Sequence, residues 1–155
     1  MESFSYPQFP RDVSTVYIAL FDRVSNAAEI RSRLVKAVSM TGPEGEHERE
    51  IMNFAFIDAR LISEAIRRYG VSDDSTAVFV VRIANSTTDA KTKMQSVVKG
   101  DLVPISDLQN ITDWGNVKKY NKLNNEPALK GAGPKEKYVV NEIVISSVAM
   151  KSVVA

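Results

Sequence analysis

Few residues of this 155-residue chain are able to do chemistry, and none lies in a pattern that indicates catalysis. The single histidine, His47, lies in TGPEGEHERE (residues 41–50) among four glutamates, and no motif surrounds it. The absence of cysteine excludes disulfides, thiolate metal sites and cysteine nucleophiles, and one histidine excludes a paired-histidine metal motif. We therefore predict no enzymatic activity, no metal site and no cofactor, and we interpret His47 as an exposed polar residue.

Two other segments have part of the character of a ligand site. Asp73 and Asp74 are adjacent carboxylates that could hold a divalent cation, but such pairs in turns usually bond to local backbone amides. GAGPK (residues 131–135) is glycine-rich, but it lacks the spacing and the terminal Lys-Ser/Thr pair of a phosphate loop. The sequence thus favours a turn at residues 71–75 and no nucleotide site.

Lysines and aromatic residues alternate between residues 114 and 122. Lys118, Lys119 and Lys122 lie beside Trp114 and Tyr120. Such an arrangement can bind RNA through phosphate contacts and base stacking. The pattern favours the alternative, in which the aromatic rings anchor a helix to the core while the lysines face water.

The overall composition is that of a soluble globular domain, with 44% apolar and 25% charged residues. No apolar run approaches the roughly 18 residues that a membrane span needs, and the N-terminus lacks the pattern of a secretory signal, so we expect an intracellular protein. Residues 1–77 carry net charge −3 and residues 78–155 carry +4. The basic half could help to meet an acidic partner, although its charge is modest for a nucleic-acid-binding domain.

Apolar periodicity and punctuation by Gly, Pro and Asp predict a mixed α/β fold, as one domain over residues 1–155. We predict strands at 13–21, 53–57 and 77–84, helices at 27–38, 59–69 and 90–99, an extended segment at 102–105, and two short helices capped by Ser106 or Asp107 and by Asp113. Asn26 and Glu29 form a capping-box-like pair, and Asp58 and Gly70 suit the two ends of the helix at 59–69. Residues 41–50 and 124–137 are predicted to be flexible loops.

The tail from residue 138 to residue 155 is ambiguous. Its Ile and Val content favours a strand, whereas Asn141 followed by Val144, Ile145, Val148 and Ala149 fits a capped helix. Spacing alone leaves both alternatives open.

Several segments, taken in order, resemble a known family. Between Pro7 and Val153 the chain reads PQFP, VSTVYIALFDRVSNAAEIRSRL, FAFIDARLI, SEAIRRYGVSDDSTAVFVVRI, VVKG, VKKYNKL and EIVISSVAMKSV. This series resembles the TPRKB (PRPK-binding protein) family, the kinase-associated subunit of the EKC/KEOPS complex, and is most similar to its fungal members. No single segment is diagnostic; the specificity comes from their order and combination.

The resemblance implies a non-catalytic subunit with helices packed around a mixed β-sheet, including a helix over Glu142–Lys151. It implies binding to the atypical small kinase/ATPase of the complex and allosteric regulation of it, in support of threonylcarbamoyladenosine modification of tRNAs that read codons beginning with adenine. It also implies links to telomere maintenance and transcription, with a location in the nucleus, telomeric chromatin included, and the cytoplasm. The alternative is a stand-alone RNA-binding module that uses the basic C-terminal half.

Site residues follow from the resemblance together with the placement of charge. For the kinase we predict contacts through Val144, Val148 and Met150, with a role of these residues as core the alternative. For tRNA we predict Lys118, Lys119 and Lys122.

The chain departs from the family at one point. In the family a long helix and a strand separate the segment like FAFIDARLI from the one like SEAIRRYG, whereas here Ile62 runs directly into Ser63. We therefore expect unpaired strand edges and an exposed apolar face in this chain.

Overall fold

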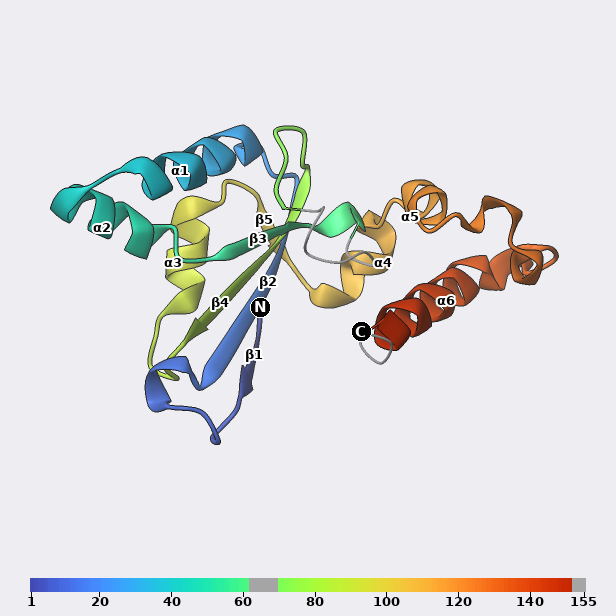
Figure 1. Cartoon of the computed structure of the whole chain (residues 1–155), viewed down its shortest axis with the longest axis horizontal. Coiled ribbons are helices and arrows are strands. Elements are labelled where there is room, and N and C mark those ends of the chain that lie inside the picture. The colour runs from blue at the N-terminus through green and yellow to red at the C-terminus, as the bar shows by residue number, and fades with distance from the viewer. Residues whose placement is uncertain (62–69, 152–155) are drawn as a thin grey trace. The chain divides into compact units, whose positions relative to one another are not determined.

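The computed structural model describes the backbone of residues 1–61 and 70–151, and the side chains of residues 1–60 and 70–147. It confirms the mixed α/β fold class (Figure 1). The chain divides into two compact units, of which the first comprises Met1–Arg60 and Gly70–Ile111, and the described part of the second begins at Thr112. Each unit is considered by itself.

The first unit is built on a five-stranded sheet in which every described pairing is antiparallel. Its strands are β1 (Glu2–Ser5), β2 (Thr15–Asp22), β3 (Ala55–Asp58), β4 (Ala77–Ala84) and β5 (Asp101–Val103). The order is β1-β2-β4-β3, and β5 also pairs with β2. The predicted strands at 13–21, 53–57 and 77–84 correspond to β2, β3 and β4, and the extended segment at 102–105 overlaps β5.

One face of the sheet carries the main core. Tyr17, Ala19 and Phe21 of β2 pair with Arg82, Val80 and Val78 of β4, and all six side chains are buried. The helices α1 (Ala27–Ser39) and α3 (Ala90–Val97) contribute Ile30 and Met94 to the same cluster. Because side chains alternate along a strand, these residues all point to the face that the helices cover. Figure 1 shows α1, α2 and α3 on one side of the sheet.

The prediction of a loop at residues 41–50 is wrong, because Gly42–Ile51 forms helix α2. Pro43 lies in its first turn, where the fixed φ of proline suits a helix start. Arg33 of α1 donates two hydrogen bonds to the carboxylate of Glu48, at 2.7 and 3.1 Å. Arg49 donates to the carbonyl oxygens of Ala37 and Met40 at the end of α1. These contacts with α1 stabilise a helix that is too polar to be predicted from apolar periodicity.

Asn26 is the N-cap residue of α1, as predicted, but the capping box is absent, because the Asn26 side chain makes no capping hydrogen bond to the helix. Its Nδ2 donates to the carbonyl oxygen of Val97, and its Oδ1 accepts from the backbone N–H of Lys99, both at 2.9 Å. The Lys99 ammonium group in turn pairs with Glu29 at 3.1 Å. Asn26 therefore joins the start of α1 to the segment between α3 and β5.

The helix predicted over residues 59–69 lies largely outside the described residues. Ala59–Leu61 is a 3-10 turn, and the carboxylate of Asp58 accepts from the backbone N–H of Arg60 at 2.9 Å. Gly70 forms an antiparallel bridge with Ile57 of β3. Its predicted role at the end of that helix concerns residues outside the described ones.

Three further helices complete the described chain: α4 (Leu108–Ile111) in the first unit, and α5 (Trp114–Tyr120) and α6 (Glu136–Lys151) in the second. Asp113 caps α5 as predicted, since its Oδ1 accepts from Asn116 N–H at 3.0 Å. The linker predicted at residues 124–137 contains 3-10 turns that begin at Leu123, Pro127 and Gly133. The tail is helical up to Lys151, as the resemblance implied, and α6 begins six residues before Glu142.

Candidate functional site

Helix α6 presents apolar side chains on two opposite sides. On one side Val140 and Val144 are buried against Val117 and Leu123, with Trp114, Leu129 and Ile143 packed around them. On the other side Tyr138 is 66% exposed and Ile145 is 55% exposed, with exposed Glu142 between them. Spacings of four and three residues place Tyr138, Glu142 and Ile145 on one strip of the helix, which we call the outer stripe of α6.

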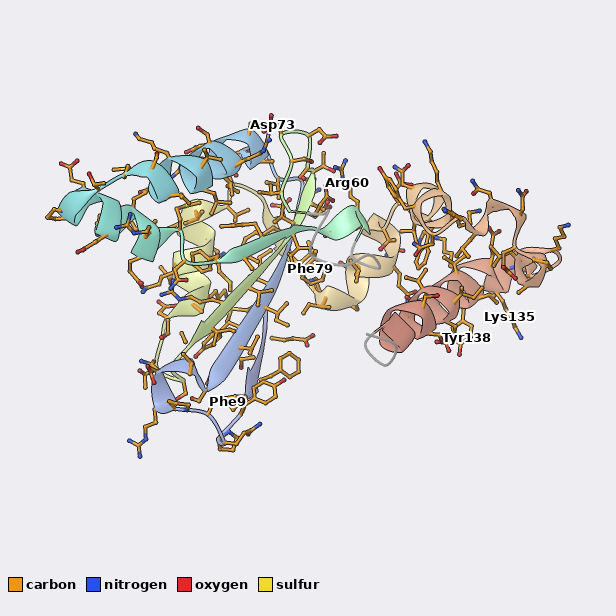
Figure 2. The ribbon with its side chains drawn as sticks, viewed as in Figure 1. Phe9, Arg60, Asp73, Phe79, Lys135 and Tyr138 are labelled. Atoms are coloured by element: carbon orange, nitrogen blue, oxygen red, sulfur yellow. The ribbon has the colours of Figure 1, made fainter. Side chains whose placement is uncertain are left out.

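Of the three residues predicted to contact the kinase, the structure describes the side chain of Val144 alone. Val144 is 1% exposed and belongs to the core of the second unit, which agrees with the core alternative. Val148 and Met150 lie on α6, but their side chains are outside the described ones. The sequence analysis missed Tyr138 and Ile145, which the period of 3.6 residues would have placed outward once Val140 and Val144 were assigned to the core. Tyr138 is labelled on α6 in Figure 2.

The three lysines predicted to bind tRNA differ in their surroundings. Lys118 donates to the carboxylate of Glu136 at 2.5 Å, so its charge is neutralised locally by the start of α6. Lys119 and Lys122 are exposed, and Lys122 adopts a left-handed φ of 59° just after α5. The basic surface of this unit is larger than predicted, because three more lysines are exposed: Lys130, Lys135 and Lys137.

The aromatic residues beside these lysines also divide. Trp114 packs against the core cluster, and the ammonium group of Lys137 lies 6.0 Å from the centre of its ring. Tyr120 is 45% exposed and is not part of the core cluster, in contrast to the preferred alternative. The buried side of α5 is formed by Val117 instead.

The most enclosed carboxylate of the first unit is Asp58, at the end of β3. Burial raises the pKa of Asp58, but hydrogen bonds from the side chain of Arg60, from Ser75 Oγ and from Arg60 N–H outweigh it and hold the pKa below its ordinary value. In the adjacent turn, Asp74 accepts from Ser72 Oγ at 2.6 Å and Asp73 pairs with Arg31 at 3.1 Å. The predicted turn is present at residues 73–74, but these two acids bind the side chains of Arg31 and Ser72. Figure 2 labels Arg60 and Asp73.

A second buried charge connects three elements of the first unit. Arg82 of β4 is buried, donates to the Glu50 carboxylate at 2.5 Å and lies 5.1 Å from the ring centre of Phe54. Lys93 of α3 reaches the same carboxylate at 3.4 Å. The hydrogen bond from Arg82 lowers the pKa of Glu50 from its ordinary value, although burial opposes this. This network ties the end of α2 to the sheet and to α3.

No reaction centre emerges from the part of the chain that the structure describes. His47 is exposed on α2, and the described residues contain no group of three His, Cys, Asp or Glu side chains that could hold a metal ion. Within the same residues no helix is long and apolar enough to cross a membrane. What the described surface offers is an apolar helical stripe and exposed lysines, which are features of a protein that binds other macromolecules.

Comparison with known families shows to which family of binding proteins the chain belongs. Residues 60–152 match the model of the family described as kinase binding protein CGI-121. Because the match extends over more than half of the chain, the protein belongs to the CGI-121 family of kinase-binding proteins. The resemblance inferred from the order of the sequence segments is thereby confirmed.

Curated relatives carry a consistent name. The chain is 29% identical to the EKC/KEOPS complex subunit CGI121 of Cryptococcus neoformans, over 99% of this chain and 100% of the relative. It is 23% identical to the subunit of the same name from Kluyveromyces lactis, over 67% of this chain and 82% of the relative. The first alignment extends over 231 positions, more than the 155 residues of this chain, so the Cryptococcus protein carries internal residues that this chain lacks. The family match begins at residue 60, next to the predicted junction of Ile62 and Ser63.

Proposed function

We propose that this protein is a non-catalytic regulatory subunit of an EKC/KEOPS complex and that it binds the atypical kinase/ATPase through the outer stripe of α6. Membership of a kinase-binding family and the name shared by its relatives support the partner. The observation that carries the site is the exposure of Tyr138 and Ile145 on the side of α6 opposite its buried residues.

The outer stripe has the composition of a binding contact. An amphipathic helix that places apolar anchors into a groove is a recurrent mode of recognition, and tyrosine is enriched among the residues that dominate binding energy. Lys135 and Lys137 are exposed next to the N-terminal end of the stripe, so an acidic rim on the kinase would complement it. Glu142 within the stripe would face a polar or basic group of the partner.

A negative charge introduced at either of two neighbouring positions of α6 separates docking from folding. Ile145→Asp should weaken binding of the purified kinase at least about 30-fold in calorimetry, since a hot-spot contact contributes about 2 kcal/mol. The thermal midpoint of this variant should stay that of the wild type, because Ile145 is exposed. The neighbouring Val144→Asp should instead destabilise the second unit by about 3 kcal/mol or more, because it buries an unpaired charge.

Val38→Asp is the matched control, because Val38 is 84% exposed on α1 in the first unit. It should bind the kinase as the wild type does. Wild-type affinity of Ile145→Asp would show that the kinase binds elsewhere on the chain.

Within the complex, the proposed role is support of threonylcarbamoyladenosine modification of tRNAs that read codons beginning with adenine, with contributions to telomere maintenance and transcription. The proposed location is the nucleus, telomeric chromatin included, and the cytoplasm. Cells that lack this subunit should regain the modified nucleoside with the wild type and with Val38→Asp, but not with Ile145→Asp. Mass spectrometry of digested tRNA measures this, and full restoration by Ile145→Asp would refute the link between docking and modification.

A role in holding tRNA is supported by the exposed lysines of the second unit. Lys119→Glu combined with Lys122→Glu should weaken tRNA binding and reduce its dependence on salt, because fewer counterions are released. Lys118→Glu should be less informative about RNA, since it also breaks the pair with Glu136. The competing function, an autonomous RNA-binding module, requires that the isolated chain retain tRNA at physiological salt and that loss of kinase binding leave its cellular role intact.

A further inference from the structure

The second face of the sheet is apolar but open over much of its area. The strand register places Phe4 of β1, Val16 of β2 and Ile83 of β4 side by side in one row of this face. The next row holds Ile18, Val81 and Ala55 in the same way. These six residues define what we call the open sheet face, and all of them are exposed or half-buried.

The openness is confined to one end of the face. In the third row, Leu20 of β2 and Phe79 of β4 are buried, although they belong to neither of the two core clusters described above. The helices α1, α2 and α3 lie on the opposite face, where they bury Tyr17, Val80 and their neighbours (Figure 1). Rows one and two therefore form an apolar surface that these helices do not cover.

Aromatic residues extend this surface past the end of β1. Tyr6 continues the alternation of Glu2 and Phe4, and its N–H still donates to the carbonyl oxygen of Ser14 in the ladder at 2.7 Å. Phe9 contacts Tyr6 edge-to-face, with ring centres 6.5 Å apart, and is labelled in Figure 2. The open sheet face is thus continued by two exposed rings.

The exposed area is enough for a weak interface. Phe4, Tyr6, Phe9 and Ile83 are 43%, 41%, 55% and 56% exposed. At about 200 Å² for each large side chain, they present roughly 400 Å², and the half-buried Val16, Ile18 and Val81 add roughly 100 Å². Two such surfaces would bury about 1,000 Å² in total, which is near the lower limit for specific association.

The charges around this surface favour an apolar, self-complementary occupant. Glu2, at the outer edge of the second row, is the single charged residue of the first two rows. An acidic or basic partner would find little to pair with there. Two copies related by a two-fold axis would instead bring apolar rows together without opposing like charges at the centre, as isologous contacts require.

We propose that a second copy of this chain packs on the open sheet face, giving a weak, reversible dimer. The contact lies on the first unit and does not use α6, so it is independent of the proposed kinase docking. The longer Cryptococcus relative carries internal residues that this chain lacks, so the dimer is proposed for this shorter chain alone.

Sedimentation velocity of the full chain from about 1 to 300 µM tests the proposal. The wild type should shift from monomer to dimer within this range. Ile83→Lys and Phe4→Lys should each raise the dissociation constant at least about tenfold, because a two-fold contact places each new charge in the interface twice. Both positions are exposed, so circular dichroism and the thermal midpoint should match the wild type.

Val38→Lys is the control, because it adds the same charge to an exposed valine of α1, and it should dimerise as the wild type does. A wild type that stays monomeric at 300 µM overturns the proposal. Binding of the apolar dye ANS by that monomer would then indicate that the face is open to another protein. No binding of ANS would indicate that the chain covers the face itself. A dimer that Val38→Lys disrupts as strongly as Ile83→Lys also overturns it.

Discussion

Replacing Asp58 by asparagine tests the reasoning about buried charge in the first unit. Asp58 is 3% exposed and accepts hydrogen bonds from Arg60, at distances down to 2.6 Å, and from Ser75 Oγ at 2.7 Å. The amide of Asp58→Asn keeps an oxygen for Ser75 but removes the negative charge that faces the guanidinium group. Breaking a buried ion pair costs about 3–5 kcal/mol, and hydrogen bonds to charged groups contribute about 1.5–3 kcal/mol.

Because Arg60 is partly exposed, this variant should lose less than the about 3–5 kcal/mol of a fully buried pair. Its side chain is 28% exposed, so water can solvate the guanidinium group that has lost Asp58. We therefore expect a loss of about 2–3 kcal/mol in the free energy of unfolding at pH 7. With a urea dependence of about 1.5 kcal/mol per molar, the midpoint should fall by about 1.3–2 M. Far-UV circular dichroism measures this, because the single tryptophan, Trp114, lies in the second unit.

The difference in the free energy of unfolding between the wild type and Asp58→Asn should decrease at acidic pH. Because the folded state holds the pKa of Asp58 below its ordinary value, the ionised carboxylate contributes its full stabilisation above about pH 4. That contribution is lost as the pH falls through the lowered pKa of the folded state. The gap between wild type and Asp58→Asn should therefore be constant from pH 7 to about pH 5 and should narrow below about pH 4.

Asp73→Asn, in the turn adjacent to Asp58, is the matched control. Asp73 pairs with Arg31, but both side chains are largely exposed, so the urea midpoint should not change measurably. Equal midpoints for Asp58→Asn and the wild type, or a gap that does not narrow in acid, would refute the stabilising role of this network.

Two further pairs of substitutions test the contacts around α2. Glu50→Ala should destabilise the first unit by about 1–3 kcal/mol, because it leaves the buried Arg82 without its carboxylate. Arg82→Met should change the stability by less than about 1 kcal/mol, because the buried Arg82 Nε already lacks a hydrogen bond. Urea titrations that rank the two variants in the opposite order would contradict this. Gly45→Ala should lower the free energy of unfolding by about 1–3 kcal/mol, because a Cβ there would lie 2.6 Å from the backbone oxygen of Met40. Its control, Glu46→Ala on the exposed side of α2, should unfold at the wild-type urea midpoint. An unchanged midpoint for Gly45→Ala would show that the pair of helices α1 and α2 can move to accommodate the added methyl group.

The fold was predictable where apolar periodicity decides the structure. Residues 77–84 are β-branched and aromatic, and β4 has the predicted bounds. The helix predicted at 27–38 is α1, which ends one residue later. Helix α2 was not predictable in this way, because its stabilising contacts are with another helix: Arg33 of α1 binds Glu48, and Arg49 binds carbonyl oxygens at the end of α1. The bonding of the Asn26 side chain was not predictable for the same reason, since its partners lie about 70 residues further along the chain.

The candidate site was predictable by element but not by side chain. The resemblance pointed to the C-terminal helix, and α6 is present, but Val144 faces its core and Tyr138 and Ile145 face outward. Because α6 has apolar residues on both sides, its sequence does not show which side faces the core. The buried partners of α6 had to be known first. Likewise, the pairing of Lys118 with Glu136 across 18 residues could not be read from the run of lysines.

The central position of β2 has a consequence for synthesis of the chain on the ribosome. Its early partner, β1, is complete before β2 itself, but β4 begins 55 residues after β2 ends, at Ala77. At about 5–20 residues per second, roughly 3–11 seconds separate the emergence of the two strands. During that interval the apolar rows of β2 have only the short hairpin with β1, and nascent-chain chaperones would have time to bind them.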